Sequence, residues 1–282
     1  MNIPFKPSSV NGKVVAITGA GGVICGAMAK ALGACGAKVA VLDLQLDKAE
    51  AVAQEIRDAG GVAKGYAANV LDKEDLAKAH QEINKDLGLI DILINGAGGN
   101  SPKATTTQEY YEPTDAEGVI SFFDLKKEGV EFVFGLNFLG TLLPCQEFCR
   151  DMIGRKGCNV LNVSSMNAFT PLTKIPAYSG AKAAISNFTK WLAVHFSKEG
   201  IRVNAIAPGF LVTAQNQALL YNPDGTPTAR TEKILAATPM NRFGEADELL
   251  GATFFLIDEA CSSFITGVVL PIDGGFSSYA GV

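Results

Sequence analysis

Short apolar runs alternate with longer amphipathic segments along almost the whole chain. The short runs are typical of strands buried on both faces, and the segments between them carry apolar residues at helical spacing. The expected strands cover residues 13–18, 38–43, 63–68, 91–95, 159–165, 201–206 and 267–271. The expected helices cover residues 24–35, 47–59, 73–88, 129–153, 178–199 and 245–257. This alternation predicts a single α/β domain over residues 1–282.

Strands separated by helices form parallel sheets through right-handed crossovers, with helices on both faces. The sequence therefore predicts a doubly wound, Rossmann-type sheet, whose ligands bind beyond the carboxyl ends of the strands. The residues that suggest chemistry all lie at the ends of predicted strands, and they are Gly19, Asp43, Asn95, Ser165 and Pro208. We expect these residues to lie along one edge of the sheet.

Two connections at that edge are long. Residues 99–127 form a polar insertion rich in Thr, Gln, Glu, Tyr and Lys, and residues 210–230 follow the sixth strand. Loops at strand ends commonly carry specificity. We expect both segments to border a substrate site, although the insertion could instead be a solvated excursion or an oligomer contact.

Composition excludes several classes of function. The 282 residues are 48% hydrophobic, the net charge is −5 and no basic block is present, so no nucleic-acid partner is expected. The start of the chain lacks the apolar run of a signal peptide, and no apolar stretch is long enough to predict a membrane span. We expect a cytoplasmic protein.

Cysteine and histidine usage predicts no metal site. Six cysteines lack the spacing of a metal or disulfide framework, and we expect Cys145 and Cys149, at helical spacing, to be buried. His80 and His195 lack carboxylate or cysteine companions at metal-ligand spacing. Both histidines are expected to be structural.

A glycine-rich turn joins the first strand to the first helix, with Gly19, Gly21 and Gly22 close together. Such a turn lets backbone amides approach a pyrophosphate at a helix N-terminus, although a plain tight turn has the same composition. Asp43 ends the next strand, where a carboxylate can bind the adenine-ribose hydroxyls and repel a 2′-phosphate. Asp43 therefore favours NAD(H) over NADP(H); its alternative role is to cap the following helix.

Tyr178 and Lys182 are four residues apart in a helical segment, so they share one helix face. Ser165 ends the neighbouring strand and can complete a compact group around a carbonyl oxygen. Because an ammonium beside a phenol favours the phenolate, we expect Lys182 to lower the pKa of Tyr178 and make it a proton donor and acceptor near neutral pH. The alternative is an ordinary amphipathic helix with a solvated lysine.

Several short segments stand in a fixed order: Thr18-Gly19, Asn95-Gly-Ala-Gly98, Asn137, Ser165, Tyr178-x-x-x-Lys182, Asn204-Ala-Ile-Ala-Pro-Gly209 and Asp273-Gly-Gly275. With these segments the chain resembles the short-chain dehydrogenase/reductase family over essentially its whole length. The resemblance implies a seven-stranded sheet and a homotetramer in which the helices at 129–153 and 178–199 contact partner subunits.

The resemblance also implies roles for individual residues. Tyr178 would exchange a proton with the substrate oxygen, Lys182 would hold the nicotinamide ribose, and Ser165 would hydrogen-bond the substrate oxygen. Asn137 would hold a water for proton relay, and Thr213 would bind the nicotinamide carboxamide. The expected cofactor-binding residues are Gly19, Gly21, Gly22, Val23, Ile24, Asp43, Asn69, Val70, Asn95, Ala97, Tyr178, Lys182, Pro208, Gly209 and Thr213.

Some positions depart from the family pattern. Two of its glycines fall on Val23 and Cys25, one of its two consecutive asparagines is Gly96, and its aspartate after the third strand is Asn69. The path of the pyrophosphate loop is therefore left open, while Asn69 could still contact adenine through its side-chain amide.

The substrate is suggested by finer details. The runs at 21–25, 95–100 and 219–225, together with the long insertion, resemble a bacterial branch of the family that interconverts D-fructuronate and D-mannonate. An anionic, polyhydroxylated substrate needs hydrogen-bond donors and a cation. The candidates are Asn100, Lys103, Asn167 and Arg230, each of which could also be an ordinary surface residue.

Two other interpretations stay open. The enzyme could act on another polyol, a ketogluconate or a 3-oxoacyl substrate. The chain could also be a non-catalytic nucleotide-binding sensor, although such proteins tend to lose the tyrosine or the lysine that Tyr178 and Lys182 retain.

Overall fold

The structure is a computed structural model that describes residues 3–213 and 217–281. Parallel strands form one seven-stranded sheet in the order β3-β2-β1-β4-β5-β6-β7. The strands are β1 Val14–Thr18, β2 Lys38–Asp43, β3 Val62–Ala67, β4 Ile92–Asn95, β5 Asn159–Val163, β6 Arg202–Pro208 and β7 Val269–Ile272. The strand order reverses between β1 and β4, which is where doubly wound sheets bind ligands. The predicted fold class is confirmed.

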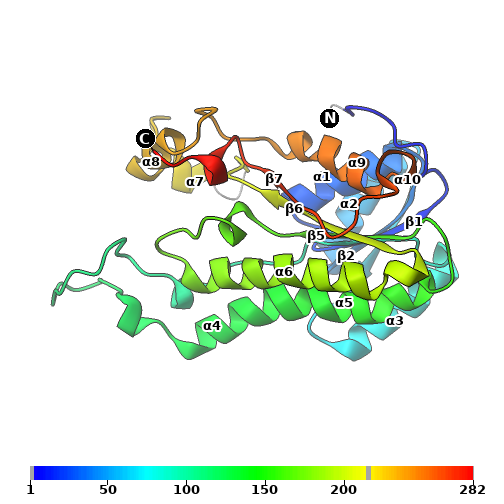
Figure 1. The fold of residues 1–282 in the computed structure, drawn as a ribbon, viewed down its shortest axis with the longest axis horizontal. Helices are drawn as coiled ribbons and strands as arrows, with labels where there is room; N and C mark the ends of the chain where they lie inside the picture. The colour runs from blue at the N-terminus through cyan, green and yellow to red at the C-terminus, as the bar shows by residue number, and fades with distance from the viewer. Residues whose placement is uncertain (1–2, 214–216, 282) are drawn as a thin grey trace.

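Helices cover both faces of this sheet (Figure 1). The helices are α1 Val23–Ala34, α2 Leu46–Asp58, α3 Lys73–Asp86, α4 Lys127–Phe134, α5 Gly140–Phe148, α6 Pro176–His195, α7 Gln217–Leu220, α8 Ala229–Ala236, α9 Leu250–Ile257 and α10 Glu259–Ser262. In Figure 1, α1 and α9 lie above the sheet and α3, α5 and α6 lie below it.

Alternate residues of β1 pack into two separate hydrophobic cores. Val15 and Ile17 of β1 pack in the cluster that contains residues of α1, α2 and α9. Val14 and Ala16 point the other way, into the cluster that contains residues of α3, α5 and α6. This period of two fits a strand covered on both faces, and it explains why the strands read as continuous apolar runs.

The helix expected at 129–153 is not one regular helix. A π-helical turn, Gly135–Leu139, separates α4 from α5, and the hydroxyl of Thr141 donates to the main-chain oxygen of Asn137 at 2.9 Å. The continuous run Lys127–Met152 is long and apolar enough, by length and composition, to cross a membrane. Here it packs against α3 and α6, with 44% of its most apolar window buried inside the protein.

The insertion at 99–127 is largely irregular, as expected, and Figure 1 shows it extending away from the body of the protein. Its regular parts are the short 3-10 helices η1 Pro102–Ala104 and η2 Phe122–Asp124. Helices α7 and α8 were not expected. The N-cap of α8 is Thr228, whose hydroxyl accepts from the Thr231 N–H at 3.3 Å, and a Thr-x-x-Thr spacing was too weak a signal to predict a helix there.

Candidate active site

The turn after β1 leaves the start of α1 open to a ligand. Gly19 has a left-handed φ of +67°, and a Cβ there would lie 2.9 Å from the backbone of Ala97, so only glycine fits this approach. The N-cap of α1 is Gly22, no side chain caps the helix, and its first turn carries no acidic residue. A helix N-terminus without a side-chain cap offers backbone N–H groups to an anion.

Asp43 stands beside this turn at the end of β2. Its Oδ2 accepts from the Gly21 N–H and its Oδ1 from the Gln45 N–H, each at 3.1 Å. The N-cap of α2 is Gln45, so Asp43 is not the helix cap that the sequence left as an alternative. Each carboxylate oxygen keeps a further lone pair, and the side chain is partly exposed. The carboxylate is therefore available to hydroxyl groups of a ligand.

Tyr178 and Lys182 lie one turn apart on α6, with the Lys182 ammonium 5.6 Å from the centre of the Tyr178 ring. Lys182 is buried and its Nζ donates to the main-chain oxygen of Val163 at 2.9 Å. The hydroxyl of Ser165 hydrogen-bonds the phenol of Tyr178. The structure thus brings together the three residues that the spacing predicted.

The proton affinities of this pair differ from the expectation. Burial raises the pKa of Tyr178, and the hydrogen bond with Ser165 opposes that rise. Burial also lowers the pKa of Lys182 to about 8, while the nearby Cys25 thiol acts weakly in the opposite direction. The expectation of a lowered pKa for Tyr178 is therefore wrong in this structure, because desolvation by burial outweighs the hydrogen bond with Ser165.

Asn137 is the central residue of the π-helical turn and is fully buried. Its Nδ2 donates to the main-chain oxygens of Gly99 at 2.7 Å and Val133 at 2.8 Å, and its Oδ1 accepts from the Gly99 N–H at 3.3 Å. A Cβ on Gly98 would meet Asn137 Oδ1 at 2.7 Å and Lys182 Nζ at 3.3 Å, so both groups approach the same point of the backbone. A relay water at Asn137 stays a prediction; Oδ1, which accepts from Gly99, and the main-chain oxygen, which accepts from Thr141, each keep a further lone pair for it.

Two departures from the family pattern compensate each other. A Cβ on Gly96 would lie 2.0 Å from the sulfur of Cys25, so the Cys25 side chain occupies the space of the missing side chain at position 96. Burial raises the pKa of the Cys25 thiol to about 12, which keeps it neutral. Cys25 and Gly96 therefore form one packing unit beneath the glycine turn.

The other predicted cofactor residues fall into two groups. Asn95 turns its side chain into the sheet, where its Nδ2 donates to Asn162 Oδ1 at 2.9 Å, so only its backbone could contact a cofactor. Asn69 is used in a local turn, accepting from the Leu71 N–H at 3.0 Å, and Val70 is buried. Of the remaining members, Val23 and Ile24 begin α1, Ala97 follows β4, Pro208 ends β6, and Gly209 and Thr213 follow β6.

Gly209 shows why the Asp273-Gly-Gly275 motif stands near the C-terminus. A Cβ on Gly209 would lie 2.5 Å from the Cα of Asp273, and the Gly209 N–H donates to the Ile272 oxygen at 2.9 Å. Asp273 then folds back, accepting from the N–H groups of Gly275 and Ser277 at 2.9 Å each. The motif thus fixes the end of β7 against the end of β6.

The four substrate candidates lie on three separate segments. Asn100 and Lys103 are exposed at the start of the insertion, and Asn100 Nδ2 donates to Thr105 Oγ1 at 3.0 Å. Arg230 is exposed on α8. Asn167 is buried, its Oδ1 has no partner, and it lines a cavity of about 400 Å³ together with residues on the face of α6 opposite Tyr178. The roles of these four residues stay predictions.

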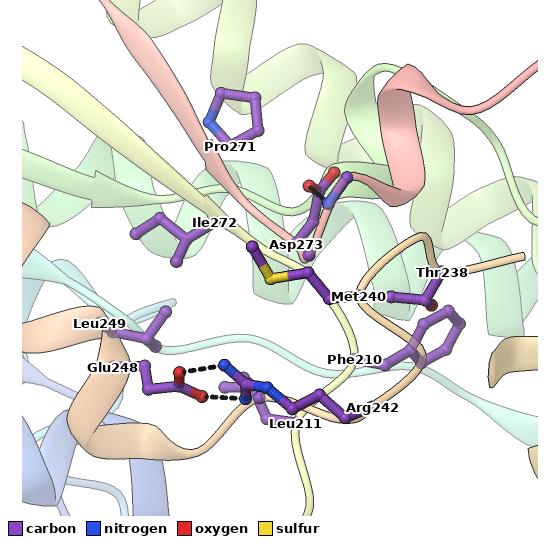
Figure 2. Close-up of a pocket in the computed structure, with 13 residues that line it drawn as sticks. Phe210, Leu211, Thr238, Met240, Arg242, Glu248, Leu249, Pro271, Ile272 and Asp273 are labelled. Carbon is purple, nitrogen blue, oxygen red and sulfur yellow. Dashed lines mark hydrogen bonds and ion pairs between the residues drawn. The ribbon is translucent and has the colours of Figure 1, made fainter.

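A second cavity, of about 360 Å³, borders the segment after β6 (Figure 2). Phe210 and Leu211 line one side of it and Asp273 another, and Figure 2 shows Arg242 paired in two contacts with Glu248 at 2.7 and 2.6 Å. None of the four predicted catalytic residues lines this cavity. It is therefore distinct from the group around Tyr178.

Sequence reasoning missed polar contacts between the side chains of distant segments. The two ring nitrogens of His80 each lie 2.9 Å from a carboxylate oxygen, one of Glu147 and one of Asp151, and both carboxylates are distant in the sequence. Glu109 of the insertion binds Lys233 of α8 at 2.8 Å. Their separations of 67 and 124 residues leave no local signal. Within residues 3–213 and 217–281, no group of three or more His, Cys, Asp and Glu side chains is arranged to hold a metal ion.

Comparisons with known proteins agree with this geometry. The family model described as short chain dehydrogenase matches residues 13–223. An uncharacterized oxidoreductase of Haemophilus influenzae is 60% identical over 282 residues, covering 100% of this chain and 99% of the relative. A 5-keto-D-gluconate 5-reductase of Escherichia coli is 31% identical over 267 residues, covering 95% of this chain and 96% of the relative.

A solved structure resembles this chain closely. It comes from Haemophilus influenza, is provisionally named a D-mannonate oxidoreductase and contains bound NAD. The two chains are 60% identical and superpose with a TM-score of 0.94 over 97% of this chain and 98% of the other.

Proposed function

Because this chain belongs to the short-chain dehydrogenase family, we propose that it interconverts D-fructuronate and D-mannonate with NAD(H) as its cofactor. The proposed substrate rests on the 60% sequence identity, over nearly the whole chain, to the Haemophilus protein whose structure is provisionally named for mannonate oxidation. The more general conclusion, that the chain is an oxidoreductase of this family, follows from the matched motifs and from the group formed by Ser165, Tyr178 and Lys182.

The residues at the β1 turn fit a dinucleotide. The N-terminus of α1 has no side-chain cap, and a Cβ on Gly21 would lie 2.8 Å from Asp43 Oδ2, so the bare backbone leaves a cradle there. Asp43 would bind the ribose hydroxyls and repel a 2′-phosphate. NAD(H) supplies hydride transfer when bound.

The residues around Tyr178 would handle the substrate oxygen. Since burial raises the pKa of Tyr178, the phenol is protonated at neutral pH and can give its proton to a carbonyl oxygen during reduction. The Ser165 hydroxyl, already bonded to that phenol, would hold the same oxygen. Lys182 would supply positive charge beside the phenolate that remains, which favours the proton transfer.

Steady-state assays with a panel of keto acids test the substrate. We expect D-fructuronate to be reduced with the highest kcat/KM and NADH to be preferred over NADPH. Tyr178→Phe should lower turnover by roughly 10²–10⁴-fold, the usual contribution of a general acid, while NADH still binds. No turnover of fructuronate, alongside efficient reduction of another ketone, would refute the substrate; preference for NADPH would refute the role of Asp43.

A 5-ketogluconate is the second candidate substrate. It is favoured by the 31% identity to the E. coli 5-keto-D-gluconate 5-reductase over 95% of this chain. Both substrates are keto sugar acids, so the polar insertion is compatible with either. The same panel separates them by their kcat/KM values.

We also propose that the protein is a cytoplasmic homotetramer. Trp191 and Val194 on α6 are 56% and 76% exposed, and the Trp191 ring stacks on His195 with centroids 4.7 Å apart. Exposed apolar side chains on one helix suit an interface. Light scattering should give about four times the 29.6 kDa chain mass, and Trp191→Glu should lower that mass.

A further inference from the structure

The insertion is fixed at its base to the helix that carries Tyr178. Ala104 of the insertion packs with Ala177 and Ala181 of α6 in a small apolar cluster, and Tyr178 packs against that cluster. The Thr106 N–H donates to the Lys174 oxygen at 2.9 Å, just before α6 begins. This side of the site therefore moves with the catalytic tyrosine.

The segment after β6 forms a separate packing unit. Leu220 of α7, Ile234 of α8 and Phe243 are buried in a cluster of their own. Phe210 and Val212, which precede the predicted carboxamide-binding residue Thr213, pack against it. This side of the site therefore moves with the predicted cofactor-binding segment.

One ion pair between described residues joins the two sides. Lys233 Nζ of α8 lies 2.8 Å from Glu109 Oε1 in the middle of the insertion. The hydrogen bond from Lys233 lowers the pKa of Glu109, and the charge of Lys174 adds to that effect. Glu109 is thus ionised at neutral pH and is held between cations from two different elements.

We propose that the Glu109–Lys233 ion pair is a positioning contact, which ties the insertion to α8 across the substrate site and so sets the affinity for substrate. The identity of the substrate rests on the proposed function, but the contact itself does not. Both segments follow carboxyl ends of strands, β4 and β6, and they border the Tyr178 side and the cofactor side respectively. Neither residue needs to touch the substrate for this role.

The size of the effect is limited by solvent. The side chains of Lys233 and Glu109 are 68% and 33% exposed, so salt screens their attraction. Exposed pairs of this kind change an equilibrium by about two- to five-fold. We therefore expect a change in KM of that size, with kcat nearly unchanged, because the Ser165–Tyr178 geometry does not depend on the pair.

The test compares Glu109→Gln, Lys233→Met and the charge-reversed double variant Glu109→Lys/Lys233→Glu. The single variants should raise the KM for the keto acid about two- to five-fold, leave the Kd for NADH unchanged, and show a weaker salt dependence of KM than the wild type. The double variant should restore the wild-type KM. Glu131→Gln is the matched control, since its exposed i,i+4 pair with Lys127 lies within one helix, and it should leave KM unchanged.

The outcomes separate this proposal from the proposed function. A double variant that stays as impaired as Lys233→Met would show that Lys233 binds the substrate directly and would overturn the positioning role. Single variants with wild-type KM would overturn it as well. If fructuronate is not the substrate, amide hydrogen exchange still tests the proposal. The Thr107 N–H donates to the Ile120 oxygen at 2.9 Å, and the Ile120 N–H donates to Thr107 Oγ1 at 2.8 Å. Both amides should exchange about two- to five-fold faster in Glu109→Gln than in the wild type. Unchanged exchange rates of these two amides would overturn the proposal that the ion pair ties the insertion to α8.

Discussion

Lys182 is a buried lysine whose ammonium donates to the main-chain oxygen of Val163 at 2.9 Å. Burial lowers its pKa to about 8, so near neutral pH the protein keeps a desolvated positive charge next to Tyr178. That charge is costly for folding and useful for chemistry, because it lies where a phenolate forms. The pair therefore places a local instability at the phenol that we propose exchanges a proton with the substrate.

The pH dependence of stability should reveal this cost. The folded-state pKa lies below the usual lysine value of 10.5, so the unfolded chain binds more protons between pH 8 and 10.5. The contribution of Lys182 to the unfolding free energy therefore rises with pH in that window. Relative to Lys182→Met, the wild type should gain on the order of 3 kcal/mol from neutral pH to the top of that window. Urea unfolding of both proteins across the window measures the gain, and parallel curves would contradict it.

Cys25 and Gly96 should behave as a coupled pair. Gly96→Ala brings a Cβ to 2.0 Å from the Cys25 sulfur, and such overpacking costs about 1–3 kcal/mol. Cys25→Ala removes the sulfur and leaves the new Cβ 3.5 Å from the Cys25 Cβ, which is an ordinary contact, but a tight approach of 3.0 Å to the Thr18 main-chain oxygen remains. A double-mutant cycle in urea should therefore show partial rescue of Gly96→Ala by Cys25→Ala. Additive losses would mean that the two positions are independent.

At the scale of elements, one buried polar chain connects two strands to the catalytic helix. Asn95 of β4 donates to Asn162 Oδ1 at 2.9 Å, and Asn162 of β5 donates to Thr189 Oγ1 of α6 at 2.9 Å. Thr189 in turn donates to the Ile185 oxygen at 2.9 Å within the helix. These bonds fix the height of α6, and hence of Tyr178, relative to the carboxyl ends of the strands.

Asn162→Ala should break this chain at its centre. The change leaves the Asn95 amide and the Thr189 hydroxyl without these partners in the interior, which costs about 1–3 kcal/mol for a group left unpaired. Thermal unfolding should show a lower Tm for Asn162→Ala than for the wild type. An unchanged Tm for Asn162→Ala would mean that water replaces the lost bonds.

An element can be predicted from the sequence when the residues that cause it to form are close together in the sequence. The strands of β1 and β2 follow from apolar runs, and the Tyr178–Lys182 pair follows from helical spacing. The π-helical turn at Gly135–Leu139 could not be predicted, because it depends on Asn137 bonding Gly99, 38 residues away. Burial decides the pKa of Tyr178, and burial is a property of the packed molecule rather than of neighbours in sequence.

Across the whole molecule, the cysteine thiols differ in their exposure to solvent. Cys25, Cys35, Cys145, Cys149 and Cys158 are buried, and Cys261 of α10 is exposed. Burial raises the pKa of Cys158, and burial together with a bond to Cys145 raises that of Cys149. Thiolates are the reactive form, so the buried groups should be inert in the folded protein.

Titration with a chromogenic disulfide should count these thiols. One equivalent per chain should react quickly in buffer and the full six only in denaturant. Cys261→Ser should abolish the fast phase without changing turnover, since α10 lies after α9 and away from the Tyr178 group. Rapid loss of activity in the Cys261→Ser variant on adding the reagent would show that a buried thiol is accessible.

The accessible thiol of Cys261 on α10 also makes the native protein a ready substrate for site-specific conjugation. A fluorophore or an immobilisation tether attached there would modify a single defined position without prior removal of the other five cysteines. Cofactor occupancy and ligand exchange could then be followed on single molecules with the natural amino-acid sequence left intact.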